Sequence, residues 1–330
     1  MAFTMHSHSG QFCPGHAKDQ LEEVIRYAIS RGYTTMGLTE HMPRTAHADL
    51  YPEELDDPDA SLAVLFPRHA AYVAEAQRLR DKYADQIHLL VGFEGEWLRD
   101  EYAALVLDLA SHEAVDYFIG SLHHVNGIPI DFDKAFYQRA LESVVVEYTQ
   151  DRQQQQPPQE QPPKPTEEQM YERYYDEQLD MLRAQKPRVV GHFDLIRLMS
   201  SQPDREMRTS GWAGVWRRIL RNLDFVASYG GWLECNSAAL RKGLAEPYPA
   251  RDIAEEWVKM GGRFTLSDDS HGIAQIGTNY ARTIAYLESL GVSSVWTFQR
   301  VGVASGGKKA ELLDREVPLE DVKKVVSTWS

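Results

Sequence analysis

The sequence predicts an α/β fold in which seven parallel strands form a closed or nearly closed barrel. Short apolar runs alternate with longer amphipathic stretches, which is typical of strand-then-helix units in a parallel sheet. Seven such units follow one another, and a barrel is an economical arrangement for so many similar units. In addition, nearly every apolar run is followed directly by a histidine or a carboxylate.

The first unit shows how the helices are predicted. Leu21, Val24, Ile25 and Ala28 follow the i, i+3, i+4, i+7 spacing of one helix face. Gly32 then supplies a typical C-terminal stop, so a helix is expected over 18–31.

The other elements follow from the same patterns. A capping box at Thr166–Gln169 opens a helix that reaches Leu182. Further helices are predicted over 67–84, 102–113, 133–149, 212–228, 250–260 and 273–290. The predicted strands are 3–8, 35–39, 87–93, 117–121, 188–191, 231–234 and 263–266, with a candidate eighth over 294–298.

Length and composition favour one globular domain. The 330 residues are 43% hydrophobic and 25% charged, and one α/β barrel can fill this length, so we predict a single domain over 1–330. The segment 150–165 contains seven Gln and five Pro, cannot bury a core, and predicts a flexible insertion. A polyproline partner motif is the alternative, but a clean P-x-x-P frame with specificity residues is missing.

Charge narrows the classes of partner. Thirty-five Lys and Arg face 49 Asp and Glu, a formal net charge of −14, so neither nucleic acid nor an anionic membrane is an expected partner. Two cysteines are too few for a disulfide framework, and neither a signal peptide nor an apolar run of membrane-spanning length is found. We therefore expect a cytoplasmic protein that acts on a small molecule.

The residues that follow the strands are the types that bind metal ions. Parallel barrels bring the carboxyl ends of all strands to one rim, so these residues are expected to converge. His6 and His8 share a strand face, and Asp269 and His271 repeat this spacing. Imidazoles with carboxylates suit zinc, manganese or iron, and the lack of clustered thiolates argues against a structural Cys-type zinc site.

Seven motifs carry a resemblance to a known family. In chain order they are HSHSGQFCPGH (6–16), LTEHMPR (38–44), GFEGE (92–96), GSLHH (120–124), GHFDLIR (191–197), ECNSAALRK (234–242) and LSDDSH (266–271). With them the sequence resembles the polymerase and histidinol phosphatase (PHP) superfamily of metal-dependent phosphoesterases, and most of all its monofunctional histidinol-phosphate phosphatases of fungi and some bacteria.

The resemblance implies a distorted seven-stranded (β/α)7 barrel with a trinuclear site at the strand C-terminal rim. One divalent ion would be held by His6, His8, Glu94 and Asp269. Glu94 would bridge to a second ion, held also by His123 and His192, and a third would be held by His16, His41 and His271. Asp269 is preferred to Asp268 because its i+2 relation to His271 matches the family's Asp-x-His. The predicted catalytic residues are Glu94, Asp269 and His271.

A mechanism is expected from such a site. Clustered divalent metals neutralise a phosphate dianion, generate a nucleophile and stabilise a leaving alkoxide. We expect a metal-bridging hydroxide to attack phosphorus in line, without a phosphoenzyme. The candidate substrate-binding residues are Arg197, Arg241, Ser237 and Arg44. Three carboxylates stay open between orienting metal-bound histidines and receiving a cationic group of the substrate: Glu40, Glu96 and Asp194.

The resemblance implies hydrolysis of L-histidinol phosphate to L-histidinol and phosphate, in histidine biosynthesis. One alternative is a phosphoesterase of the same superfamily that acts on another small phosphate or on nucleic acid ends. Another is a metal-binding module without catalysis, which the complete set of ligand-type residues disfavours.

Overall fold

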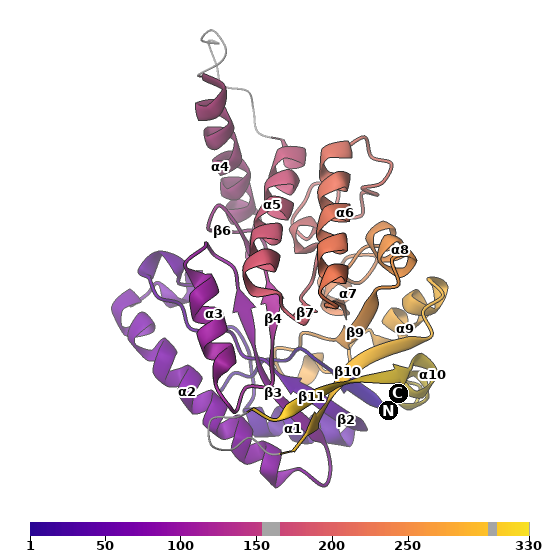
Figure 1. Cartoon of the computed structure of the whole chain (residues 1–330). Helices are drawn as coiled ribbons and strands as arrows, with labels where there is room; N and C mark the ends of the chain where they lie inside the picture. The colour runs from indigo at the N-terminus through magenta and orange to yellow at the C-terminus, as the bar shows by residue number, and fades with distance from the viewer. Residues whose placement is uncertain (154–165, 303–308, 330) are drawn as a thin grey trace.

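The computed structural model describes residues 1–153, 166–302 and 309–329, without the side chains of 145–153. Within them, seven parallel strands form one sheet in the order β1-β2-β3-β4-β7-β8-β9 (Figure 1). The strands are β1 (Ala2–Thr4), β2 (Tyr33–Leu38), β3 (His88–Glu96), β4 (Tyr117–Ser121), β7 (Val189–Val190), β8 (Trp232–Asn236) and β9 (Arg263–Ser267).

Backbone hydrogen bonds join the two edge strands of this sheet. The Met5 amide donates to the Leu266 carbonyl at 3.0 Å, and the His8 amide donates to the Ser270 carbonyl at 2.7 Å. The sheet is therefore a nearly closed barrel, and the predicted fold class is confirmed.

Helices follow the strands and surround the barrel (Figure 1). They are α1 (Leu21–Ser30), α2 (Pro58–Lys82), α3 (Tyr102–Ser111), α4 (Lys134–Gln153), α5 (Glu167–Gln185), α6 (Ala213–Ser228), α7 (Ala238–Arg241), α8 (Arg251–Lys259), α9 (Tyr280–Ser289) and α10 (Leu319–Val326). The capping box that opens α5 is present, since Thr166 accepts from the Gln169 amide. None of the helices in the described residues is long and apolar enough to cross a bilayer.

Two predicted helix boundaries are wrong. Helix α2 begins at Pro58, well before the predicted start at 67, because the Asp57 side chain caps it by accepting from the Ala60 amide. The predicted helix 273–290 is divided into a short 3-10 turn, η4 (Ile273–Gln275), and α9. Asn279 adopts φ 63°, which is not helical and separates the two.

The predicted insertion at 150–165 also starts too early. Residues 150–153 complete α4, since glutamine is a good helix former and the first proline comes later. The remainder, 154–165, lies outside the described residues.

The candidate eighth strand exists but is not part of the barrel sheet. Strand β10 (Ser294–Val301) pairs antiparallel with β11 (Glu311–Pro318). Phe298 of β10 stacks on Trp232 at a centroid distance of 4.4 Å and contacts Tyr117 at 5.4 Å, and these two residues begin β8 and β4. The hairpin thus covers the amino-terminal end of the barrel and leaves the opposite end, with the ligand-type residues, uncovered by it.

A second hairpin lies at that opposite end. Strands β5 (His124–Val125) and β6 (Ile128–Pro129) pair antiparallel around Asn126 and Gly127, which have φ values of 52° and 72°. Asn-Gly suits such a two-residue turn because both positions require positive φ. The hairpin directly follows His123.

Candidate metal centre

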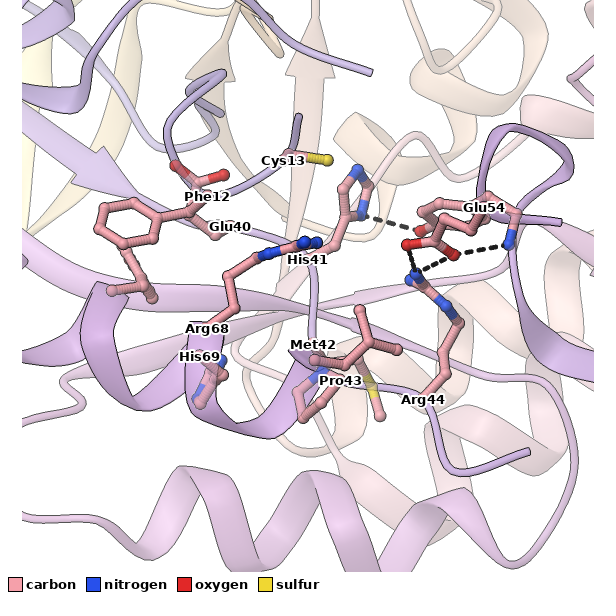
Figure 2. A pocket seen from close by; sticks show the side chains of 13 residues that line it. Phe12, Cys13, Glu40, His41, Met42, Pro43, Arg44, Glu54, Arg68 and His69 are labelled. Atoms are coloured by element: carbon pink, nitrogen blue, oxygen red, sulfur yellow. Dashed lines mark hydrogen bonds and ion pairs between the residues drawn. The ribbon is translucent and has the colours of Figure 1, made fainter. Parts of the chain in front are cut away.

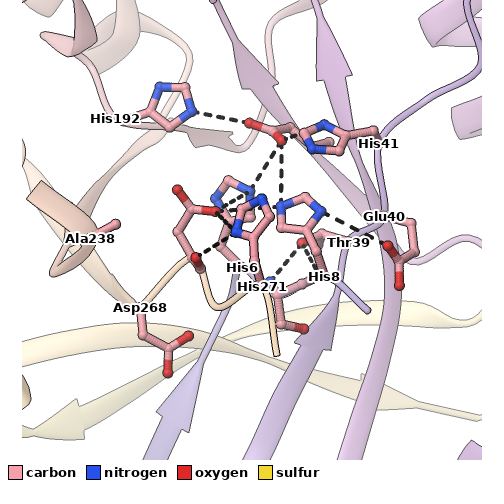
Figure 3. Close-up of polar contacts among 12 residues, drawn as sticks. His6, His8, Thr39, Glu40, His41, His192, Ala238, Asp268 and His271 are labelled. Atoms are coloured by element: carbon pink, nitrogen blue, oxygen red, sulfur yellow. Dashed lines mark hydrogen bonds and ion pairs between the residues drawn. The ribbon is translucent and has the colours of Figure 1, made fainter. Parts of the chain in front are cut away.

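Glu94, near the end of β3, lies at the middle of a buried cluster of imidazoles, of which Figure 3 labels His6, His8, His41, His192 and His271. Its Oε2 atom is 3.4 Å from His6 Nε2, 3.6 Å from His8 Nε2 and 3.0 Å from His41 Nδ1. Its Oε1 atom faces a different pair of histidines. One carboxylate is therefore shared between two groups.

The first group joins the start and the end of the barrel. Asp269 Oδ1 is 3.5 Å from His8 Nε2 and 3.7 Å from His6 Nε2. Two ligand atoms that each lie 2.0–2.1 Å from a tetrahedral zinc ion are about 3.3 Å apart. These spacings are close to those of ligands that share one ion.

The second group lies at the ends of β4 and β7. Glu94 Oε1 is 3.1 Å from His192 Nε2 and 3.4 Å from His123 Nε2, and the two imidazole nitrogens are 3.0 Å apart. All three side chains point at one spot.

The third group contains His41 and His271, and the structure brings His8 closer to this pair than His16. Ligand atoms of His8, His41 and His271 all lie within 4.8 Å of one another. The His16 ring is adjacent, 4.8 Å from the His271 ring and 5.3 Å from the His41 ring, and its side chain is 38% exposed. His16 thus lies at the outer side of the cluster.

Several imidazole nitrogens of the cluster are buried without a hydrogen-bond partner among the described residues. They include the Nε2 atoms of His6, His8, His41 and His271. A buried polar atom without a partner costs about 1–3 kcal/mol. Neutral imidazoles and ionised carboxylates are metal donors, so these residues fit a bound divalent cation.

The electrostatics of the cluster show an excess of buried negative charge. Burial would raise the pKa of Glu94, but the charges of His6 and His123 outweigh it and hold the pKa well below its usual range. Burial, followed by the charge of His41, lowers the pKa of His8 to about 3, so this imidazole is neutral. Burial also lowers the pKa of His6, but Glu234 and Asp269 outweigh it and raise that pKa well above its usual value. The centre therefore favours additional positive charge.

Two outer carboxylates orient the cluster. Glu234 Oε1 is 2.8 Å from His6 Nδ1, and its Oε2 accepts from the His192 amide at 2.9 Å. Glu96 Oε1 is 3.0 Å from His123 Nδ1. The sequence indicated no role for Glu234, although it ends the predicted strand 231–234 as the ligand-type residues end theirs.

A loop between β2 and α2 completes the outer side of the centre. Tyr51 donates to Glu96, and its ring stacks on His16 at 5.6 Å. Glu53 Oε1 is 2.8 Å from His16 Nδ1. Neither Tyr51 nor Glu53 was predicted from the sequence as a site residue.

Asp268 and Asp269 point in different directions. Figure 3 shows the Asp268 carboxylate turned away from the histidines, and it accepts from Tyr33 at 3.1 Å and from the Gly277 amide at 2.7 Å. The Asp269 carboxylate lies in the first group, and its backbone has φ 46°. The structure thus brings Asp269, and not Asp268, to the centre.

A cavity of about 360 Å³ opens beside the cluster. It is lined by His16, His41, Tyr51, Pro52, Glu53, Glu96, His123, His124, Pro129, Asp131, Phe132, Arg241, Lys242, His271 and Gln275. Arg241, a predicted substrate contact, donates to the carbonyls of Asp268 and Asp269 at 2.9 and 3.0 Å. Its guanidinium is thereby held beside the centre.

The other three predicted substrate contacts are not among the lining residues of this cavity. The Arg197 side chain is 3% exposed, with Nε 2.9 Å from Asp194 and Nη2 donating to the carbonyls of Glu246 and Pro247. The Ser237 hydroxyl donates to the Thr278 carbonyl at 2.8 Å. Asp194 lies in the same motif as Arg197, but the carbonyl partners of Arg197 and Ser237 are distant along the chain, so the motifs do not show these contacts.

Arg44 lies in a second, smaller pocket behind His41 (Figure 2). Its Nη2 donates to both carboxylate oxygens of Glu54 at 2.6 Å. Glu40 also lines this pocket, and it accepts from the Ser9 amide at 2.9 Å. Burial raises the pKa of Glu40 to about 8.

Comparisons with known proteins agree with this architecture. A family model described as PHP domain matches residues 4–238. The chain is 40% identical to a protein of Schizosaccharomyces pombe named "Probable histidinol-phosphatase", over 91% of this chain and 90% of that protein. It is 32% identical to the histidinol-phosphatase of Saccharomyces cerevisiae, over 86% of this chain and 87% of that protein.

Solved structures share the fold. One from Listeria monocytogenes gives a TM-score of 0.68 at 22% identity, covering 85% of this chain and 99% of that chain. The histidinol phosphate phosphatase of Lactococcus lactis, solved with zinc, L-histidinol and phosphate, gives 0.61 at 17% identity, covering 94% and 98%.

Proposed function

Because the chain belongs to the PHP domain family, we propose that it is a metal-dependent histidinol-phosphatase of histidine biosynthesis. It hydrolyses L-histidinol phosphate to L-histidinol and inorganic phosphate. The observation that carries the proposal is the position of Glu94 between two groups of imidazoles, beside a cavity sized for a small molecule. The yeast relatives that bear this name match most of the chain.

We propose three divalent ions, of zinc, iron or manganese, held by the residues that the sequence indicated. His6, His8, Glu94 and Asp269 would hold the first, and Glu94, His123 and His192 the second. His41 and His271, with His16 at the outer side, would hold the third. When bound, such ions neutralise the phosphate, activate water and stabilise the leaving alkoxide.

The chain's own residues then bind and orient. Glu94, Asp269 and His271 act as ligands at the reacting centre, while Glu234 fixes the ring of His6. Arg241 binds the phosphate, since its guanidinium is held at the cavity wall by two backbone carbonyls and offers further N–H donors. Arg197, buried against Asp194, has a structural role instead.

We also propose that the described residues form a single domain. The family match ends at residue 238, before β9. Strand β9 completes the sheet and carries Asp269 and His271 at its end, so the site requires the last third of the chain. A cytoplasmic location is proposed as well, in keeping with the two unpaired cysteines, Cys13 and Cys235.

The test is phosphate release from L-histidinol phosphate, measured beside sugar phosphates, nucleotides and a short single-stranded DNA. The sample has a measured metal content, and a chelator-stripped sample is the control. Strong preference for L-histidinol phosphate, lost on stripping and restored by metal, is expected. Efficient release from another substrate would move the assignment within the PHP family, and no release from a fully loaded protein would indicate a non-catalytic module.

A further inference from the structure

We propose that Asp131 and Phe132 form a subsite for the cationic, ring-bearing organic end of the phosphorylated substrate. This inference rests on the proposed function and adds the residues that select the substrate's amine and imidazole. Sequence analysis assigned neither residue a role. The subsite lies just after the β5–β6 hairpin, which itself directly follows His123 of the metal centre.

The chain holds these two residues in place from both sides. Before them, the Ile130 amide donates to the His123 carbonyl at 3.0 Å, and Ile130 is fully buried. After them, Asp133 Oδ1 accepts from the Phe136 amide at 2.8 Å, in the first turn of α4. Asp131 and Phe132 therefore line the cavity as a short segment between two fixed points.

Asp131 is the cavity carboxylate that is available to a ligand. The cavity contains three carboxylates, and two are engaged: Glu53 with His16, and Glu96 with Tyr51 and His123. Asp131 is half-buried and has no hydrogen bond or ion pair with any residue that the structure describes. A half-buried carboxylate without a partner is well placed to bind an ammonium or imidazolium group.

The cavity has opposite charges in two places. Arg241 and Lys242 line it, and Arg241 is tied to the backbone of Asp269. The cationic part therefore adjoins the first metal group.

The anionic part adjoins the second metal group. Asp131 directly follows Ile130, whose amide donates to the His123 carbonyl at 3.0 Å, and both Asp131 and His123 line the cavity. A ligand with a phosphate at one end and a cation at the other matches this separation of charge.

Phe132 supplies an apolar surface beside Asp131. Its side chain is 47% exposed and lines the cavity. Its ring packs edge-to-face on Phe136, with centroids 5.5 Å apart, so its orientation is fixed. A flat cationic ring can stack on such a face.

The test separates the two ends of the substrate by using the two products as binding probes. Inhibition constants of L-histidinol and of inorganic phosphate are measured for the wild type and for Asp131→Asn, Phe132→Leu and Arg241→Ala. Asp133→Asn is the matched control: it removes a charge two residues away, and asparagine keeps the capping bond to α4. Metal content and thermal unfolding are recorded for every variant.

Asp131→Asn is expected to weaken L-histidinol binding about 10–100-fold and to leave phosphate binding within about twofold. Phe132→Leu is expected to weaken L-histidinol about 2–5-fold. Arg241→Ala should do the reverse, weakening phosphate, and Asp133→Asn should change neither constant.

Unchanged L-histidinol binding by Asp131→Asn, or an equal loss for both probes, would overturn the subsite while wild-type turnover of L-histidinol phosphate upholds the proposed function. A wild type that neither hydrolyses L-histidinol phosphate nor binds L-histidinol would overturn both.

Discussion

Replacing Glu234 by glutamine should weaken metal binding through the tautomer of one histidine. In the structure Glu234 Oε1 is 2.8 Å from His6 Nδ1, and both side chains are fully buried. In the metal-bound form His6 is neutral, and because a carboxylate accepts, its one proton is on Nδ1 and its Nε2 lone pair faces Glu94 and the centre. Glu234 Oε2 accepts from the backbone amide of His192 at 2.9 Å. A glutamine side chain can keep an oxygen at this position only if its NH₂ group points toward His6.

The size of the effect follows from that contact. The NH₂ group then faces the Nδ1–H group, and both are donors. Either this contact stays unpaired, or the imidazole moves its proton to Nε2, the atom that must bind the metal. Both outcomes remove the charge-assisted hydrogen bond between Glu234 and His6, which is worth about 1.5–3 kcal/mol. This corresponds to a loss in metal affinity of about 10–100-fold, the range found for carboxylates that orient a metal-bound histidine.

The assay is metal retention against increasing chelator, with metal per chain measured together with phosphate release. Asp116→Asn is the control, because Asp116 is also a buried carboxylate that accepts from a backbone amide, that of Val91 at 2.8 Å, and pairs with Arg80 and Arg300. It lies at the start of β4, at the other end of the barrel, and should affect unfolding alone. Retention by Glu234→Gln equal to that of the wild type would refute the tautomer argument.

Three further predictions concern the centre, the phosphate and acid stability. Glu94→Gln should abolish phosphate release and lower metal content with little change in the melting of metal-free protein, and normal turnover at full metal content would contradict the shared-ligand role. Arg241→Ala should lower kcat/KM about 10–100-fold with unchanged melting, whereas Arg197→Ala should destabilise the fold by about 3–5 kcal/mol, because Asp194 then lacks its buried partner. Thermal melting and steady-state kinetics of both variants decide whether these two arginines differ in this way. Burial lowers the pKa of His69 to about 4, so between pH 6.5 and about 4 the unfolded chain binds a proton that the folded chain does not, and stability falls as pH decreases. His69→Leu should reduce that loss by up to about 3 kcal/mol in metal-free protein, as measured by urea unfolding at both pH values.

The parts of the site that could be predicted from sequence are those encoded locally. His6 and His8 lie two residues apart after a short apolar run, and Asp269 and His271 repeat this pattern. Because parallel strands bring their carboxyl ends to one rim, such patterns imply convergence without knowledge of any long-range contact. Six of the seven barrel strands lie within three residues of their predicted bounds for the same reason, whereas the first, predicted over 3–8, ends at Thr4, before His6 and His8.

The parts that sequence analysis missed depend on contacts between distant segments. Glu53 contacts His16 from a loop after the next strand, and Tyr51 in the same loop contacts Glu96. Conversely, the motif position of Arg197 suggested a phosphate contact, but Asp194 and two distant carbonyls hold its guanidinium in the protein interior. A motif gives the residue type, whereas its direction depends on what packs around it.

The acidic character of the chain also has a physical reason at the site. A net charge of −14 would repel a phosphate ester, and the cluster adds buried carboxylates such as Glu94, Glu234 and Asp269 to that charge. Those carboxylates face imidazoles at ligand spacing, so they act on an anionic substrate through the cations that they attract. Asp131, by contrast, lines the cavity without a hydrogen-bond or ion-pair partner in the described part of the chain, and there a carboxylate can bind a ligand that carries its own positive charge. The same acidic composition can thus serve both ends of an amino-alcohol phosphate, and Asp131→Asn, which affects one end alone, separates the two uses.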